Sequence, residues 1–117
     1  MKTLAIIALL ALTSCATFRA DTPSQRLFGI QADYNGALAV AVAYESQPRC
    51  APVPVQPCSD TTTVIKMRAA DDVAWSLLRN AQAIARNPDS AATTVSAAID
   101  AALTAVSAFK TITGGVK

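Results

Sequence analysis

The sequence predicts an all-α protein: an up-down-up bundle of three helices that follows a cleaved N-terminal signal peptide. In three successive segments, apolar side chains recur at alternating three- and four-residue spacings, the period of a helix with one buried face. Hydrophobic residues make up 52% of the chain but aromatic residues only 5%, so the core must consist of small and medium aliphatic side chains. That composition favours closely packed helices over a sheet.

The N-terminus has the parts of a bacterial export signal. Met1-Lys2 supplies a positive charge, and the apolar run over 3–12 is too short for a membrane span, which needs about 20 residues. The run ends in Leu12-Thr13-Ser14-Cys15, which resembles the lipobox of bacterial lipoproteins. The resemblance implies cleavage before Cys15 and acyl chains, such as palmitate, on that residue. It therefore implies a membrane anchor.

The lipobox resemblance divides the chain into a signal peptide (1–14), a lipidated tether (15–21), the bundle (22–113) and a flexible tail (114–117). The alternative is an ordinary secretory signal, cut after Ala16 or Ala20, which would discard Cys15. By the sorting rule known for enteric lipoproteins, Ala16 after the cysteine implies the outer membrane, with the bundle facing the periplasm.

The first helix is predicted over about 23–46. Thr22-Pro23-Ser24-Gln25 has the pattern of a capping box with proline in the first helical position. Pro48 disfavours helical geometry in the residue before it, which sets the end of the helix. The predicted buried seam consists of Leu27, Ile30, Tyr34, Ala37, Ala41 and Tyr44, with both tyrosine hydroxyls reaching the surface.

The segment over 47–59 contains four prolines, which exclude a helix and a central strand. In an exported chain, Cys50 and Cys58 are expected to form a disulfide that closes this loop. Two interpretations stay open. The loop is either a connector that fixes the helix pair on its two sides, or a binding surface with Arg49 and Val53 or Val55 exposed at its tip.

The second helix is predicted over about 60–86, capped by Ser59 or Asp60, and should pack antiparallel to the first. Trp75 and Arg79 are one turn apart, so the guanidinium can stack on the indole at the edge of the bundle. Alternatively, Trp75 is a hot spot for a protein partner. The predicted seam is Met67, Ala70, Ala74, Leu77, Ala81 and Ile84, flanked by Val64 and Leu78.

Asp71 and Asp72 form the acidic doublet of the chain. Adjacent helical residues point about 100° apart, so the two carboxylates should not converge on one substrate. They are expected on a solvated face, with Asp72 paired to Arg68 one turn earlier.

The third helix is predicted over about 88–113, with Asn87 as its cap and Pro88 in the first helical position. Gly114-Gly115 should end it and begin the flexible tail. The predicted buried stripe is Val95, Ile99, Ala102, Val106 and Phe109, with Leu103 and Ile112 beside it.

The sequence offers little for catalysis. It has no histidine, and Cys50 and Cys58 are too far apart for a C-x-x-C redox or zinc pair. We therefore expect a protein that is not an enzyme and has no metal or cofactor. A net charge of +2 without a basic cluster also argues against nucleic acid.

Two further resemblances bear on function. The chain is similar at its two ends, Cys15 and Lys117, to the major outer-membrane lipoprotein of enteric bacteria, which implies a link from Lys117 to peptidoglycan. It also resembles small exported proteins of unknown function from proteobacteria and their phages. The matching stretches are Tyr34-Asn35, Ala37-Leu38, Ala43-Tyr44, Pro48-Arg49-Cys50, Cys58-Ser59-Asp60 and Ala70-Asp71-Asp72.

The expected function is a non-catalytic envelope lipoprotein that contacts the membrane through Cys15 and binds an envelope protein. One alternative is a phage-derived envelope factor, for superinfection exclusion or lysis. The other is the peptidoglycan tether through Lys117. The sequence indicates neither the identity of the partner nor the oligomeric state.

Overall fold

The computed structural model describes residues 22–52 and 55–116. Over these ranges the chain forms three α-helices and no strand: α2 (Pro23–Glu45), α3 (Thr61–Arg86) and α4 (Ala92–Gly114). The predicted all-α fold, with a disulfide-closed loop between the first two helices, is confirmed. The predicted signal peptide, the predicted tether with Cys15, and the residues Val53 and Lys117 lie outside the described residues.

The start of α2 has the predicted capping box. The Gln25 backbone N–H donates to Thr22 Oγ1 at 3.2 Å, and the Thr22 N–H donates to Gln25 Oε1 at 3.2 Å. The two bonds satisfy backbone groups that a helix start leaves without partners. The buried face of α2 is the predicted seam without exception: Leu27, Ile30, Tyr34, Ala37, Ala41 and Tyr44.

In α3 the buried face is rotated slightly from the predicted seam. Ala70, Leu77 and Ile84 are only partly buried, while Val64 and Leu78, predicted as flanking residues, are fully buried. The buried set is Val64, Met67, Ala74, Leu78 and Ala81.

The prediction for the start of α4 was wrong by four residues. Asn87 is the C-cap of α3, and its Oδ1 accepts a hydrogen bond from the Asp89 backbone N–H at 3.0 Å. The segment 88–91 is therefore a connection, and α4 begins at Ala92 after an N-cap, Ala91, without a side-chain cap. The physical reason is burial. The apolar stripe of α4 begins only at Val95, so extending the helix back to Pro88 would bury no further apolar side chain.

The rest of α4 follows the prediction with three corrections. Val95, predicted in the buried stripe, is only partly buried. Leu103, expected beside the buried stripe, is 41% exposed. The predicted flexible tail is also wrong up to Val116, because α4 continues through Gly114 and Val116 packs against the core. The buried residues are Ile99, Ala102, Ala105, Val106, Phe109 and Thr113.

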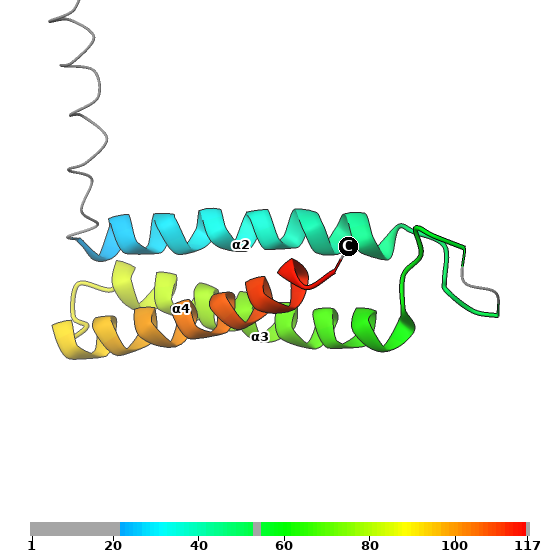
Figure 1. Cartoon of the computed structure of the whole chain (residues 1–117). Helices are drawn as coiled ribbons and strands as arrows, with labels where there is room; N and C mark the ends of the chain where they lie inside the picture. Colours follow the sequence, from blue (N-terminus) through cyan, green and yellow to red (C-terminus); the bar gives the residue numbers. More distant parts are fainter. Residues whose placement is uncertain (1–21, 53–54, 117) are drawn as a thin grey trace, which may run out of the picture.

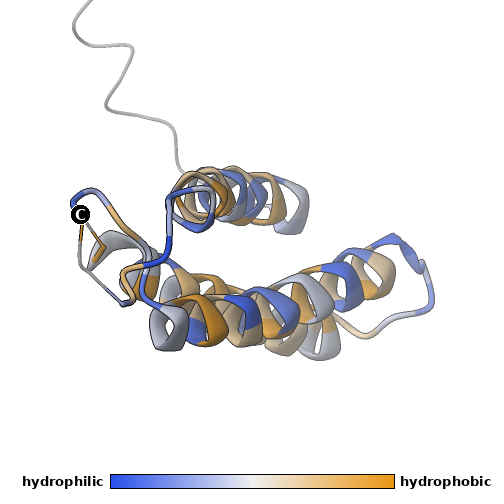
Figure 2. Cartoon of the chain, turned by 90° about the vertical axis from the view of Figure 1, so that its right-hand side faces the viewer, coloured by the Kyte–Doolittle hydropathy of each residue, from blue (hydrophilic) through white to orange (hydrophobic). Residues whose placement is uncertain are grey.

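The helices run up, down and up, and α2 lies across the layer that α3 and α4 form (Figures 1 and 2). The tightest pairing is between α3 and α4, followed by α2 with α4; the expected α2–α3 pair is the loosest. Two ion pairs, Arg26–Asp100 and Lys110–Asp33, join α2 to α4.

By length and composition α4 could cross a membrane, yet here one face is buried in the bundle core and its two charged residues pair with α2.

The bundle has two distinct ends. The start of α2 and the α3–α4 turn lie at one end, and the loop between α2 and α3 lies at the other (Figure 1). The 23 residues of α2 separate these ends by about 34 Å at 1.5 Å per residue. We call the first the anchor end, after the anchor that the sequence predicts before α2, and the second the loop end.

Candidate functional site

The loop at the loop end is closed at its base by a disulfide and by backbone hydrogen bonds. Cys50 and Cys58 are bonded, with their Cα atoms 5.0 Å apart. The Cys50 N–H donates to the Ser59 carbonyl at 3.2 Å, and the Ser59 N–H donates to the Pro48 carbonyl at 2.8 Å. The predicted disulfide is therefore confirmed, and we call residues 50–58 the cystine loop.

Ser59 is the central polar residue of this base, and sequence reasoning assigned it only a capping role. Its side chain is fully buried; the hydroxyl donates to the Gln47 carbonyl at 3.1 Å and accepts from Arg49 Nη1 at 3.2 Å. Arg49 was expected at the tip of the loop, but its backbone pairs with Ser59 at the base. The predicted position of Arg49 is therefore corrected: the residue is exposed, as expected, but it lies at the base of the loop and helps to close it.

The base of the cystine loop is also fastened to both neighbouring helices. The Asp60 backbone N–H donates to the Tyr44 hydroxyl at 2.8 Å. Asp60 caps α3 by accepting from the Thr63 N–H at 2.8 Å, and this bond lowers the pKa of the Asp60 carboxyl. The Tyr44 hydroxyl, predicted to reach the surface, instead joins the end of α2 to the start of α3.

Beyond this base, Val55 is an exposed apolar side chain of the loop, with 68% of its surface accessible. Val53, the other predicted tip residue, lies outside the described residues. An exposed valine on a loop whose base is closed by a disulfide can bind a partner at a lower entropic cost, because the bond already restrains the two ends of the loop.

The second candidate surface is centred on Trp75 of α3. The indole is 45% exposed, the Arg79 guanidinium lies 5.4 Å from its ring centre, and Tyr34 of α2 stacks on it with ring centres 5.6 Å apart. The predicted stacking of Arg79 on Trp75 is present. The indole is thus an edge residue that packs against α2 and still keeps an accessible face.

The acidic doublet lies partly inside this second surface. Asp71 accepts a hydrogen bond from the Tyr34 hydroxyl at 2.7 Å, so the expectation of two solvated carboxylates is wrong for Asp71. Burial, together with this bond, raises the pKa of Tyr34 above its ordinary value. Asp72 is exposed as expected.

The predicted Arg68–Asp72 pair is also wrong. Arg68 pairs instead with Glu45 of α2, with Nη2 and Oε2 3.0 Å apart. The hydrogen bonds from Arg68 lower the pKa of the Glu45 carboxyl. The Arg68–Glu45 pair joins two helices, so the partner of Arg68 depends on how α2 and α3 are aligned.

The two candidate surfaces do not form one patch. Trp75 lies fourteen residues after Thr61, the first residue of α3, which is about 21 Å along the helix from the loop end. A protein partner must therefore bind the cystine loop, bind the Trp75 surface, or cover both with an interface longer than about 21 Å.

Within the described residues, no group of three or more histidine, cysteine or carboxylate side chains is placed to hold a metal ion. Cys15 and Lys117, the predicted lipidation and peptidoglycan sites, lie outside the described residues. Comparison of this chain with protein-family models, with curated proteins and with solved structures found no match.

Proposed function

We propose that this chain is a non-catalytic bacterial envelope lipoprotein that is held at a membrane by a lipid on Cys15 and binds a protein partner with its cystine loop. The lipobox residues Leu12-Thr13-Ser14-Cys15 support the anchor. The bond between Cys50 and Cys58 supports export, because disulfides persist in the periplasm and are rare in the cytosol.

The two-ended shape of the bundle carries the proposal. The tether would enter at the start of α2, and the cystine loop lies at the opposite end (Figure 1). An anchor at one end therefore turns the loop away from the bilayer, about 34 Å along α2. A helical spacer with a disulfide-closed loop at its far end suits the capture of a protein beyond the membrane surface.

The ionisable groups support a role without catalysis. Glu45 pairs with Arg68, Asp60 caps α3, and Asp71 accepts from the hydroxyl of Tyr34. Each of these carboxylates serves the fold, and the chain contains no histidine to act as a general base.

The peptidoglycan tether through Lys117 gains less support. Lys117 lies outside the described residues, and the three helices fold back on one another, so the bundle reaches no farther than about one helix length. The partner-binding loop is therefore the proposal that we favour.

The test is affinity capture from detergent-solubilised bacterial envelopes with the lipidated protein tagged at its C-terminus. The informative variant is Val55→Asp, which places a charge on the exposed side chain of the loop. Val42→Asp is the matched control, because Val42 is 60% exposed on the flank of α2. Cys15→Ala tests whether capture needs the anchor.

We expect a partner that is enriched with the wild type and with Val42→Asp and lost with Val55→Asp. Equal enrichment with Val55→Asp and the wild type would contradict binding by the loop. Undiminished capture by Cys15→Ala would contradict a role for the anchor.

A further inference from the structure

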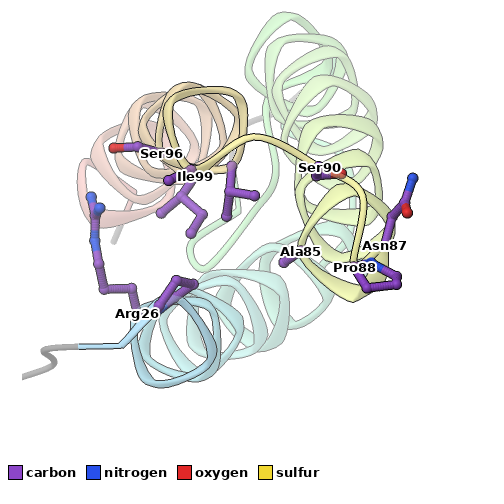
Figure 3. Close-up of a pocket in the computed structure, with 10 residues that line it drawn as sticks. Arg26, Ala85, Asn87, Pro88, Ser90, Ser96 and Ile99 are labelled. Atoms are coloured by element: carbon purple, nitrogen blue, oxygen red, sulfur yellow. The ribbon is translucent and has the colours of Figure 1, made fainter.

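A pocket opens at the anchor end of the bundle, between the first turn of α2, the end of α3 and the start of α4 (Figure 3). Its volume is about 400 Å³. That is within the range of about 300–1,000 Å³ that is typical of small-molecule sites. The proposed function leaves this pocket without a role.

The interior of the pocket is apolar. Ile99 points into the opening (Figure 3) and is only 1% exposed. Val95 and Ala85, which are partly buried, also line the pocket. These side chains belong to or pack against the hydrophobic core, so the pocket is an entrance to the core from one end. Such an interior suits a hydrocarbon chain better than a polar metabolite.

The rim of the pocket is polar and positively polarised. Arg26 is the one charged residue among the described lining residues, and hydroxyls of Ser90 and Ser96 accompany it. One guanidinium nitrogen bonds to Asp100, which leaves other N–H groups of the five-donor fork for a second acceptor. Arg26 crosses from α2 towards α4 on one side of the opening (Figure 3).

Helix ends add to this polarity. The N-termini of α2 and α4 both lie at the anchor end, whereas α3 contributes a single C-terminus there (Figure 1). Each N-terminus is equivalent to about half a positive charge. Ala91, the N-cap of α4, gives no side-chain cap, so the first turn of α4 keeps its N–H groups for an anion at this rim.

The position of the pocket suggests where its ligand comes from, and this step rests on the proposed function. If Cys15 is lipidated, the seven residues 15–21 separate the anchor from Thr22, a span of at most about 25 Å in an extended chain. The mouth of the pocket is therefore within reach of the bilayer surface. An apolar interior with a positive rim is complementary to an anionic lipid.

We propose that this pocket binds an anionic membrane phospholipid, with one acyl chain against Val95 and Ile99 and the phosphate at Arg26 and the first turn of α4. The lipid would hold the anchor end of the bundle on the membrane and so orient the cystine loop away from it.

The experiment uses the native lipidated protein in growing bacteria. Cells take up a diazirine-bearing fatty acid, which enters the phospholipids and the acyl chains of lipoproteins alike. After irradiation, the protein is purified and its adducts are mapped by peptide fragmentation. Adducts that retain a glycerophosphate come from phospholipid, whereas adducts joined to the Cys15 peptide come from the protein's own anchor.

We expect glycerophosphate adducts concentrated at 92–99. Val95→Trp should fill the pocket and lower these adducts about tenfold. The acyl chain would lose the burial of about two of its methylene groups, and that loss corresponds to about a tenfold weaker binding. Ala108→Trp is the matched control, because it also introduces a tryptophan, into an α3–α4 groove of about 510 Å³ that contains Asp100 and no cation among its described lining. We expect it to leave the adducts unchanged.

Arg26→Gln tests the polar part of the site, and Lys110→Gln is its control. Both changes break an ion pair between α2 and α4, but only Arg26 lines the pocket. Fewer phospholipid adducts with Arg26→Gln alone would support the proposal. An equal effect of both, adducts spread evenly over the helices, or adducts joined mainly to the Cys15 peptide would overturn it.

The intact mass of the same purified protein keeps the two proposals apart. An acylated Cys15 without phospholipid adducts at the pocket would overturn the lipid site and leave the lipoprotein assignment standing. An unacylated Cys15 would contradict the lipoprotein assignment itself.

Discussion

Breaking the bond between Cys50 and Cys58 should destabilise the bundle without unfolding it. The bond closes a loop of nine residues, counted from a sequence separation of 8 plus one. In the chain-entropy relation, a loop of this length contributes about 2.5 kcal/mol to the free energy of unfolding at 25 °C. The three prolines within 50–58 already stiffen the unfolded loop, so the gain should be smaller, about 2 kcal/mol.

For a domain of this size, 1 kcal/mol shifts the melting temperature by about 4–8 °C. We therefore expect reduction followed by alkylation to lower the melting temperature by roughly 8–16 °C. The helical circular dichroism at 25 °C should be unchanged, because the core lies on the three helices and the hydrogen bonds of Ser59 still close the base of the loop. The assay is a thermal melt of oxidised and alkylated samples, with alkylation of the oxidised protein as the control.

Two results would refute this reasoning. A shift below about 3 °C would mean that the hydrogen-bonded base holds the loop without the bond. A loss of helical signal at 25 °C would mean that the helices depend on the disulfide and that the core is too weak to fold alone.

Three further predictions concern packing and titration. Phe109→Ala should lower the free energy of unfolding by about 3–5 kcal/mol, because Phe109 is fully buried. Phe28→Ala should change it by less than about 0.5 kcal/mol, because Phe28 is 75% exposed. Urea unfolding compares the two variants, and equal effects would contradict the assignment of Phe109 to the core. Asp60 has a lowered pKa, so its contribution to stability is present above its unfolded pKa of about 3.9 and is lost as the pH falls through the lower folded value. Asp60→Asn keeps a cap that does not titrate, so its urea midpoint should fall less between pH 5 and pH 3 than that of the wild type; parallel curves would contradict the capping role. Tyr34 has a raised pKa, so its contribution to stability is complete below the unfolded pKa of about 10 and is lost at higher pH. Tyr34→Phe should therefore flatten the decline of the melting temperature at alkaline pH. An unchanged decline would contradict this role of Tyr34.

The local features of the fold were predictable because the signals lie close together in the sequence. Thr22 and Gln25 form the predicted capping box, and the three-four spacing identified all six buried residues of α2. The spacing of Cys50 and Cys58, together with the predicted export signal, was sufficient to predict the disulfide. Each of these inferences needs only neighbouring residues and the compartment.

Contacts between helices were not predictable in the same way. Arg68 was assigned to Asp72 on its own helix, but the alignment of α2 against α3 brings Glu45 to it instead. The partnership of Tyr34 with Asp71 depends on the same alignment. No local pattern encodes that alignment.

The candidate site was predictable only in outline. The sequence indicated a closed loop, yet Ser59 and Arg49 at its base carry no signal that distinguishes them from ordinary loop residues. At the α3–α4 turn, Pro88 suggested a helix start, but Asn87 and Asp89 form a turn there and α4 begins at Ala92. The pocket at the anchor end depends on that turn and had no counterpart in the sequence.

The most direct test of the lipoprotein account is mass spectrometry of the mature N-terminus, on protein purified from bacterial envelopes. The account predicts a chain that begins at Cys15 and carries a diacylglyceryl group and acyl chains on that residue. A mature chain that begins at Thr17 or Asp21 without lipid, as an ordinary secretory cleavage after Ala16 or Ala20 would produce, would contradict it.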